Sequence, residues 1–114
     1  MFIVDRDNKR TFDPDTGFEL KIIKRYREGP WNFSLTLNEK VIIFSASFKQ
    51  ELSPGHPTIV FWKIEWISIP LSIETDFAKN LVVSAMSAYK QINGLPETSN
   101  VVVDYDGCRV RVVS

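Results

Sequence analysis

Apolar and polar residues alternate with a period of two along most of this chain, which is the pattern of half-buried antiparallel strands. The alternation predicts strands over residues 2–4, 18–26, 33–37, 41–48 and 58–69. Residues 41–48 are apolar on both faces, which favours a central position in the sheet. Pro70 has no N–H to donate and ends the last of these ladders.

The period changes to three and four over residues 74–93, which predicts a single long amphipathic helix. Its apolar stripe consists of Phe77, Leu81, Ala85, Ala88, Tyr89 and Ile92. Ser72 or Thr75 can cap its N-terminus, and Gly94 suits the left-handed residue that follows a helix. Just before the helix, Trp62 and Trp66 are expected to share one face of their strand and to form the floor under the helix.

Two turns are also expected from residue type. The segment DPDTG at 13–17 contains a proline that fixes φ, a glycine and two aspartates suited to bonding the backbone. After the helix, Asp106-Gly107 separates VVVDY from CRVRVV and predicts a β-hairpin.

These elements together predict an α+β fold with one domain over residues 1–114. The expected sheet is mainly antiparallel and strongly twisted, with about six to seven strands and the helix packed on one face. The expected order is five strands, the helix, and two further strands.

Charge and composition limit the classes of binding partner that are expected. The chain has 14 basic and 14 acidic residues in 114 and a formal net charge of zero, so neither nucleic acid nor an anionic membrane is expected as a partner. One basic cluster, close to Tyr26 and Trp31, resembles in composition a surface for single-stranded nucleic acid, although a solvated strand face explains it better. Its members are Lys21, Lys24, Arg25 and Arg27.

The single cysteine indicates a reducing compartment, since it cannot form an intramolecular disulfide. No signal peptide and no apolar run long enough to cross a bilayer is recognisable, so a cytoplasmic location is expected.

Few residues suggest chemistry. Cys108 and His56 are the only candidates for a thiol nucleophile and its base, and a small hydrophobic packing role for Cys108 is favoured over catalysis. Three acidic pairs, Asp5/Asp7, Asp13/Asp15 and Asp104/Asp106, have spacings compatible with a divalent cation, but turn formation is favoured for them. Neither a metal site nor a cofactor is expected, and the chain is not expected to be an enzyme.

Four segments resemble small immunity proteins of bacterial polymorphic-toxin and contact-dependent growth-inhibition systems. They are YREG at 26–29, FSASF at 44–48, WISIP at 66–70 and the SAYKQING end of the helix. The resemblance covers about three-quarters of the chain, from residue 26 onward. It implies a cytoplasmic protein without catalytic activity that binds one cognate toxin domain and blocks it. The role of the segment before residue 26 is left open.

A surface for that partner can be placed from the strand order. In a meander, the loops at 27–31 and 49–57 leave the same end of the sheet. We therefore expect Glu28, Trp31, Glu51 and His56 to form one rim that contacts the partner. Trp31 is either an exposed anchor of this rim or a side chain folded over the end of the sheet.

Two other classes of function remain open. The first is a generic interaction or homodimerisation module, which would pair the strand at 108–113 with its copy. An immunity protein is instead expected to be a monomer or a weak dimer. A small enzyme is the less favoured alternative and would require a concave pocket around Cys108 or an acidic pair.

Overall fold

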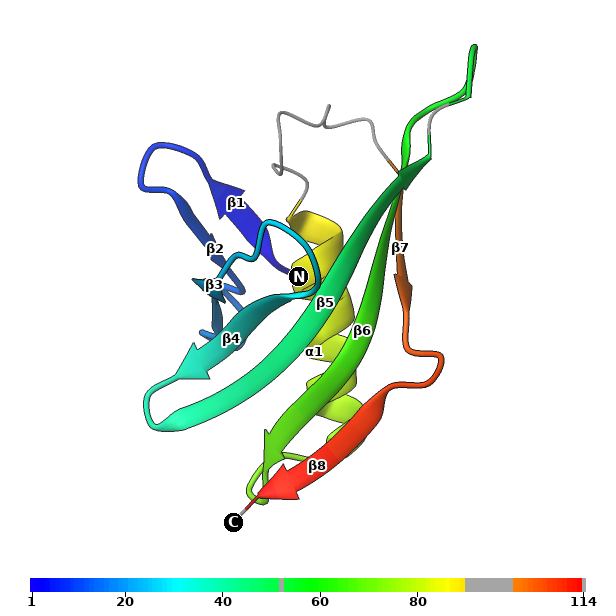
Figure 1. Ribbon diagram of the computed structural model, residues 1–114. Coiled ribbons are helices and arrows are strands. Elements are labelled where there is room, and N and C mark those ends of the chain that lie inside the picture. The colour runs from blue at the N-terminus through cyan, green and yellow to red at the C-terminus, as the bar shows by residue number, and fades with distance from the viewer. Residues whose placement is uncertain (52, 90–99, 114) are drawn as a thin grey trace.

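The computed structural model describes residues 1–51, 53–89 and 100–113, which fold into a sheet with one helix packed on it (Figure 1). The predicted α+β class, with a mostly antiparallel sheet and a single helix, is confirmed. The elements are β1 (Ile3–Asp5), β2 (Arg10–Phe12), β3 (Glu19–Lys24), β4 (Trp31–Leu37), β5 (Lys40–Glu51), β6 (Ile59–Pro70), α1 (Thr75–Ala88), β7 (Asn100–Asp104) and β8 (Arg109–Val113).

The sheet is built around two long strands, β5 and β6, of 12 residues each. Strands β1 to β6 form an antiparallel meander, and β5 lies between β4 and β6 as its apolar character predicted. The strand after the helix runs parallel to β6. A helix that covers the sheet returns the chain to the start of the preceding strand, so the next strand must run in the same direction as that strand.

The hairpin predicted at Asp106-Gly107 is wrong. Strand β7 pairs with Ile59–Lys63 and β8 pairs with Trp66–Pro70, both parallel to β6, so the chain continues along one edge (Figure 1). Gly107 has a φ of +74°, and the N–H of Cys108 donates to the carbonyl of Tyr105 at 2.9 Å. This turn displaces the chain without reversing it, because the second half of β6 still offers unpaired backbone groups.

The helix begins one residue later than expected and presents a different stripe. Its buried residues are Ala78, Leu81, Val82, Ala85 and Met86. Leu81 and Ala85 are buried, and Ala88 and Tyr89 are partly buried against the core, as predicted, but Phe77 is 45% exposed. Small Ala78 and Ala85 allow close packing on the sheet, which the ring of Phe77 would prevent. Glu74 is the N-cap residue and makes no side-chain cap hydrogen bond, so the proposed caps at Ser72 and Thr75 are wrong. The predicted helix end at 90–93 and the cap at Gly94 lie outside the described residues.

A β-bulge divides β6 into two halves. Ala46 pairs with Ile64 while its neighbour Ser45 pairs with Trp66, which leaves Glu65 as an extra residue. Past the bulge the alternation is shifted by one residue, so Ile67 is fully buried. Trp66 therefore lies on the face of the sheet away from α1, and its predicted place under the helix is wrong.

Trp62 does occupy the predicted floor of the helix. It is fully buried, and its ring centroid lies 5.6 Å from that of Phe33 and 5.2 Å from that of Phe48. Phe33 in turn stacks on Phe44 at 5.1 Å. These aromatic contacts form the centre of the core.

The turn predicted at 13–17 is confirmed, and its first residue, Asp13, accepts the hydrogen bonds that hold it. The Asp13 carboxylate accepts hydrogen bonds from the N–H of Asp15 at 3.0 Å and from the hydroxyl of Thr16 at 2.9 Å. Gly17, with a φ of +88°, donates its N–H to the Asp13 carbonyl at 2.7 Å. Burial works against ionisation of Asp13, but these hydrogen bonds outweigh it and lower the pKa of its carboxyl.

Replacing Asp13 with alanine is expected to lower the free energy of unfolding by about 1–3 kcal/mol, because it removes two partly buried hydrogen bonds, from the N–H of Asp15 and the hydroxyl of Thr16, worth about 0.5–1.5 kcal/mol each. Since the folded pKa is lowered, the contribution of Asp13 is present above the unfolded value of about 4 and is lost as the pH falls below it. Urea titrations at pH 7 and below pH 4 measure both effects. The matched control is Asp15→Ala, whose side chain is 80% exposed; an equal loss in both variants would contradict the role of Asp13.

Candidate protein-binding face

The candidate thiol and imidazole are far apart. His56 lies in the loop before β6, whereas Cys108 immediately precedes Arg109, which pairs with Trp66. The stretch from Ile59 to Trp66 separates them by roughly 20 Å at the rise of a strand. Cys108 is partly buried against the core, and burial raises the pKa of its thiol. Burial therefore favours the neutral thiol, and His56 is not within hydrogen-bonding reach of it.

The acidic pairs take part in their own turns. Asp5 accepts from the N–H of Asn8 at 3.3 Å, and Asp104 accepts from the N–H of Asp106 at 2.8 Å. Within the described parts of the chain, no three His, Cys, Asp or Glu side chains lie close enough together to hold a metal ion. The same residues include no helix long and apolar enough to cross a membrane.

Trp31 packs against the core at the end of the sheet. It is the first residue of β4 and is half-buried, with its ring centroid 6.2 Å from that of Trp62. Its indole N–H donates to the carbonyl of Tyr26 at 3.1 Å, and the guanidinium of Arg25 lies 5.1 Å above its ring. Of the two alternatives for Trp31, the structure shows the side chain folded over the sheet.

The other residues of the expected rim are exposed but separated. The two loops leave the same end of the sheet, as the meander predicts, but Trp31 pairs with Ala46 and β5 continues for five more residues to Glu51. This extension places Glu51 roughly 15 Å beyond Trp31, whereas Glu28 precedes Trp31 in the β3–β4 loop and His56 follows Glu51 in the β5–β6 loop. Figure 1 shows the β5–β6 hairpin projecting past the rest of the sheet.

A different surface lies on the face of the sheet that α1 does not cover. Strand pairing places Trp66 beside Arg109, and Ser68 between Ile43 and Arg111. We call these five residues the Trp66 patch. They line a shallow depression of about 500 Å³ to which Ile67 and Val110 also contribute. The patch therefore combines one half-buried indole, an aliphatic side chain and two exposed guanidinium groups.

The two arginines of the Trp66 patch have no carboxylate partner among the described residues. Elsewhere, Arg10 pairs with Glu19 at 2.8 Å and Lys49 with Glu51 at 3.7 Å. Tryptophan and arginine are the residue types most enriched at the energetic centres of protein interfaces. Guanidinium groups without an ion-pair partner can bind the carboxylates of another protein, because no existing ion pair has to be broken first.

The uncovered face continues beyond the patch toward the tip of the β5–β6 hairpin. Phe61 and Lys63 line a second depression of about 280 Å³, together with Lys49, Glu51 and Asp104. Val102 pairs with Phe61 and is 42% exposed. Apolar and charged side chains thus alternate along a face that one partner could span.

The sequence reasoning missed the Trp66 patch because it did not include the bulge. A regular strand without the bulge would place Trp66 on the same face as Trp62, in the core. A signal did exist for the arginines: Arg109 and Arg111 are two residues apart in a strand and must share a face.

Comparison with known proteins does not assign the chain to a family. No protein-family model, no curated protein and no solved structure matches this chain.

Proposed function

We propose that this chain is an immunity protein that binds a cognate bacterial toxin domain through the uncovered face of its sheet and blocks it by contact. The observation that carries the proposal is the Trp66 patch, where an indole lies beside Arg109, and Arg111 follows two residues along the same strand; neither arginine has an ion-pair partner among the described residues. A partner surface with acidic groups around an apolar centre is its complement.

Two further observations support a binding role over a catalytic one. The candidate nucleophile Cys108 and its candidate base His56 lie about 20 Å apart, near opposite ends of the stretch from Ile59 to Trp66. The resemblance of four segments to immunity proteins supports the specific class of partner. Because these proteins act by occupying a surface, an aromatic and basic face serves the function without any reacting group.

The test uses the reading frame directly upstream of this one. The proposal expects it to encode a large secreted protein with a toxic C-terminal domain, and expects that purified domain to form a one-to-one complex with this chain. Calorimetry should give a nanomolar dissociation constant, and co-expression should restore growth of cells that produce the toxin. A toxin domain that neither binds this chain nor is neutralised by it would overturn the proposal.

Homodimerisation through β8 is a second candidate, favoured by one specific observation. Strand β8 pairs only with β6 among the described strands, so its outer edge has unpaired backbone groups, and Val110 and Val112 are 41% and 50% exposed. Sedimentation at two concentrations separates the two candidates. A concentration-dependent dimer that is lost in a Val112→Pro variant would support pairing of β8 with its copy.

A further inference from the structure

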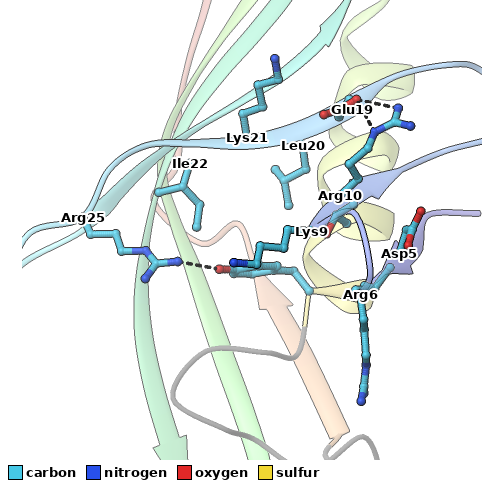
Figure 2. A pocket seen from close by; sticks show the side chains of 12 residues that line it. Asp5, Arg6, Lys9, Arg10, Glu19, Leu20, Lys21, Ile22 and Arg25 are labelled. Atoms are coloured by element: carbon cyan, nitrogen blue, oxygen red, sulfur yellow. Dashed lines mark hydrogen bonds and ion pairs between the residues drawn. The ribbon is translucent and has the colours of Figure 1, made fainter.

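A second site lies on the helix side of the sheet, away from the Trp66 patch. It is a pocket of about 540 Å³ between the β1–β2 hairpin, β3 and the C-terminal end of α1. Tyr89 gives it an apolar wall together with Leu20 and Ile22, which Figure 2 labels. Its volume falls in the range of pockets that bind small molecules.

Positive charge dominates this pocket although the chain as a whole is neutral. Five cationic and two acidic side chains line it. Glu19 is bound to Arg10 at 2.8 Å, and Asp5 accepts a hydrogen bond from the amide of Asn8 at 2.9 Å. Neither Lys9 nor Arg25 has a carboxylate partner among the described residues. The pocket therefore has uncompensated positive charge.

Lys9 and Arg25 approach the pocket from opposite sides. Figure 2 shows the Lys9 side chain, from the turn between β1 and β2, pointing toward Arg25, which follows β3. Arg25 also donates a hydrogen bond to the hydroxyl of Tyr89 at 3.3 Å, which leaves the hydroxyl proton available to an acceptor. Two cations converging beside a hydroxyl donor form a binding site for an anion.

The backbone at Lys9 supports a role for its side chain. Its φ is +53°, in the left-handed region where glycine or asparagine is favoured over lysine. The only other non-glycine residue with positive φ among the described residues is Asn38, a residue type that tolerates this conformation. Lysine at such a position is explained if its ammonium group is needed in the pocket.

We propose that this pocket binds a small organic phosphate, with the phosphoryl oxygens between Lys9 and Arg25 and the organic part against Leu20 and Ile22. A phosphate dianion has enough charge and acceptors for both cations, whereas a carboxylate has a single negative charge. The apolar wall favours a ligand with a planar or aliphatic group over inorganic phosphate. The site does not depend on the proposed immunity function, since it lies on the other side of the sheet.

The test is calorimetric titration of the full chain with phenyl phosphate, inorganic phosphate, benzoate and phenol. Phenyl phosphate should bind saturably and at one site, more tightly than inorganic phosphate or benzoate, and phenol should not bind. Lys9→Gly and Arg25→Gln should each weaken phenyl phosphate binding by about tenfold or more, the loss expected for one charge-assisted hydrogen bond.

A matched control separates the effect of removing the Lys9 charge from the effect of relieving its positive φ. Lys9→Gly and Asn38→Gly both relieve a positive φ, so both should keep or raise the melting temperature, but only Lys9→Gly should weaken binding. No saturable binding of phenyl phosphate by the unmodified chain would overturn the proposal, as would equal affinity in all variants. Tighter binding of an oligonucleotide without a terminal phosphate, with an affinity that rises with its length, would also overturn it in favour of a nucleic-acid surface.

Discussion

Replacing Trp62 with alanine is expected to lower the free energy of unfolding by about 3–5 kcal/mol, a large part of the roughly 5–15 kcal/mol of a domain of this size. Trp62 is fully buried, and its ring packs against the aromatic rings of Phe33 and Phe48 on the neighbouring strands. Its removal leaves a cavity that residues on two long strands and a helix cannot easily fill. Urea unfolding followed by far-ultraviolet circular dichroism measures the loss.

A milder substitution shows which part of Trp62 contributes. The indole N–H of Trp62 has no acceptor among the described residues, so Trp62→Phe removes a buried unpaired donor together with part of the ring. Trp62→Phe should therefore cost less than half as much as Trp62→Ala. An equal cost for both variants would mean that the indole N–H has a partner that stabilises the fold.

Local alternation predicts the face of a residue only as far as the strand is regular. Residues up to Ile64 follow the expected pattern, with Val60, Trp62 and Ile64 fully buried. Glu65 then occupies a bulge, and every residue after it changes face. No glycine or turn residue marks this position, so the types of the residues around Glu65 do not predict the bulge.

Pairing with the distant strand β6 also determines how the last two strands are arranged. An Asp-Gly pair between two apolar runs predicts a hairpin because it considers only neighbouring residues. The structure instead uses the free edge of the 12-residue strand β6 for both β7 and β8. The helix direction was predictable from its place in the chain, and it already required β7 to run parallel to β6.

The surfaces proposed for binding are the part of the structure that is least predictable from the sequence. The residues of the expected rim are individually exposed or at the sheet end, but they are brought to two separate places by the unequal lengths of β4 and β5. The Trp66 patch and the basic pocket each combine residues more than 40 positions apart in sequence. Such groupings depend on register and bulges, which residue spacing does not specify.

Replacing Trp66 with alanine is expected to weaken binding to the proposed toxin partner by about 30-fold or more, the effect of losing a central interface residue worth at least 2 kcal/mol. Arg109→Gln should weaken it further when combined with Trp66→Ala, and should reduce the dependence of the association rate on salt. Calorimetry and stopped-flow mixing at two ionic strengths measure these effects. Trp66 belongs to the uncovered face, so its loss should affect stability much less than the loss of Trp62, four residues earlier.

Two control variants distinguish this face from other surfaces that the partner could use. Phe77→Ala removes a 45% exposed aromatic side chain from α1, on the opposite side of the sheet, and should leave the affinity unchanged. Glu28→Lys reverses an exposed charge on the rim expected from the sequence, without the packing loss that Trp31→Ala would cause. If Glu28→Lys weakens binding while Trp66→Ala does not, the partner binds at the β3–β4 loop. If both weaken it, the interface extends from the loop across the uncovered face, because Trp31 and Trp66 belong to strands separated only by β5.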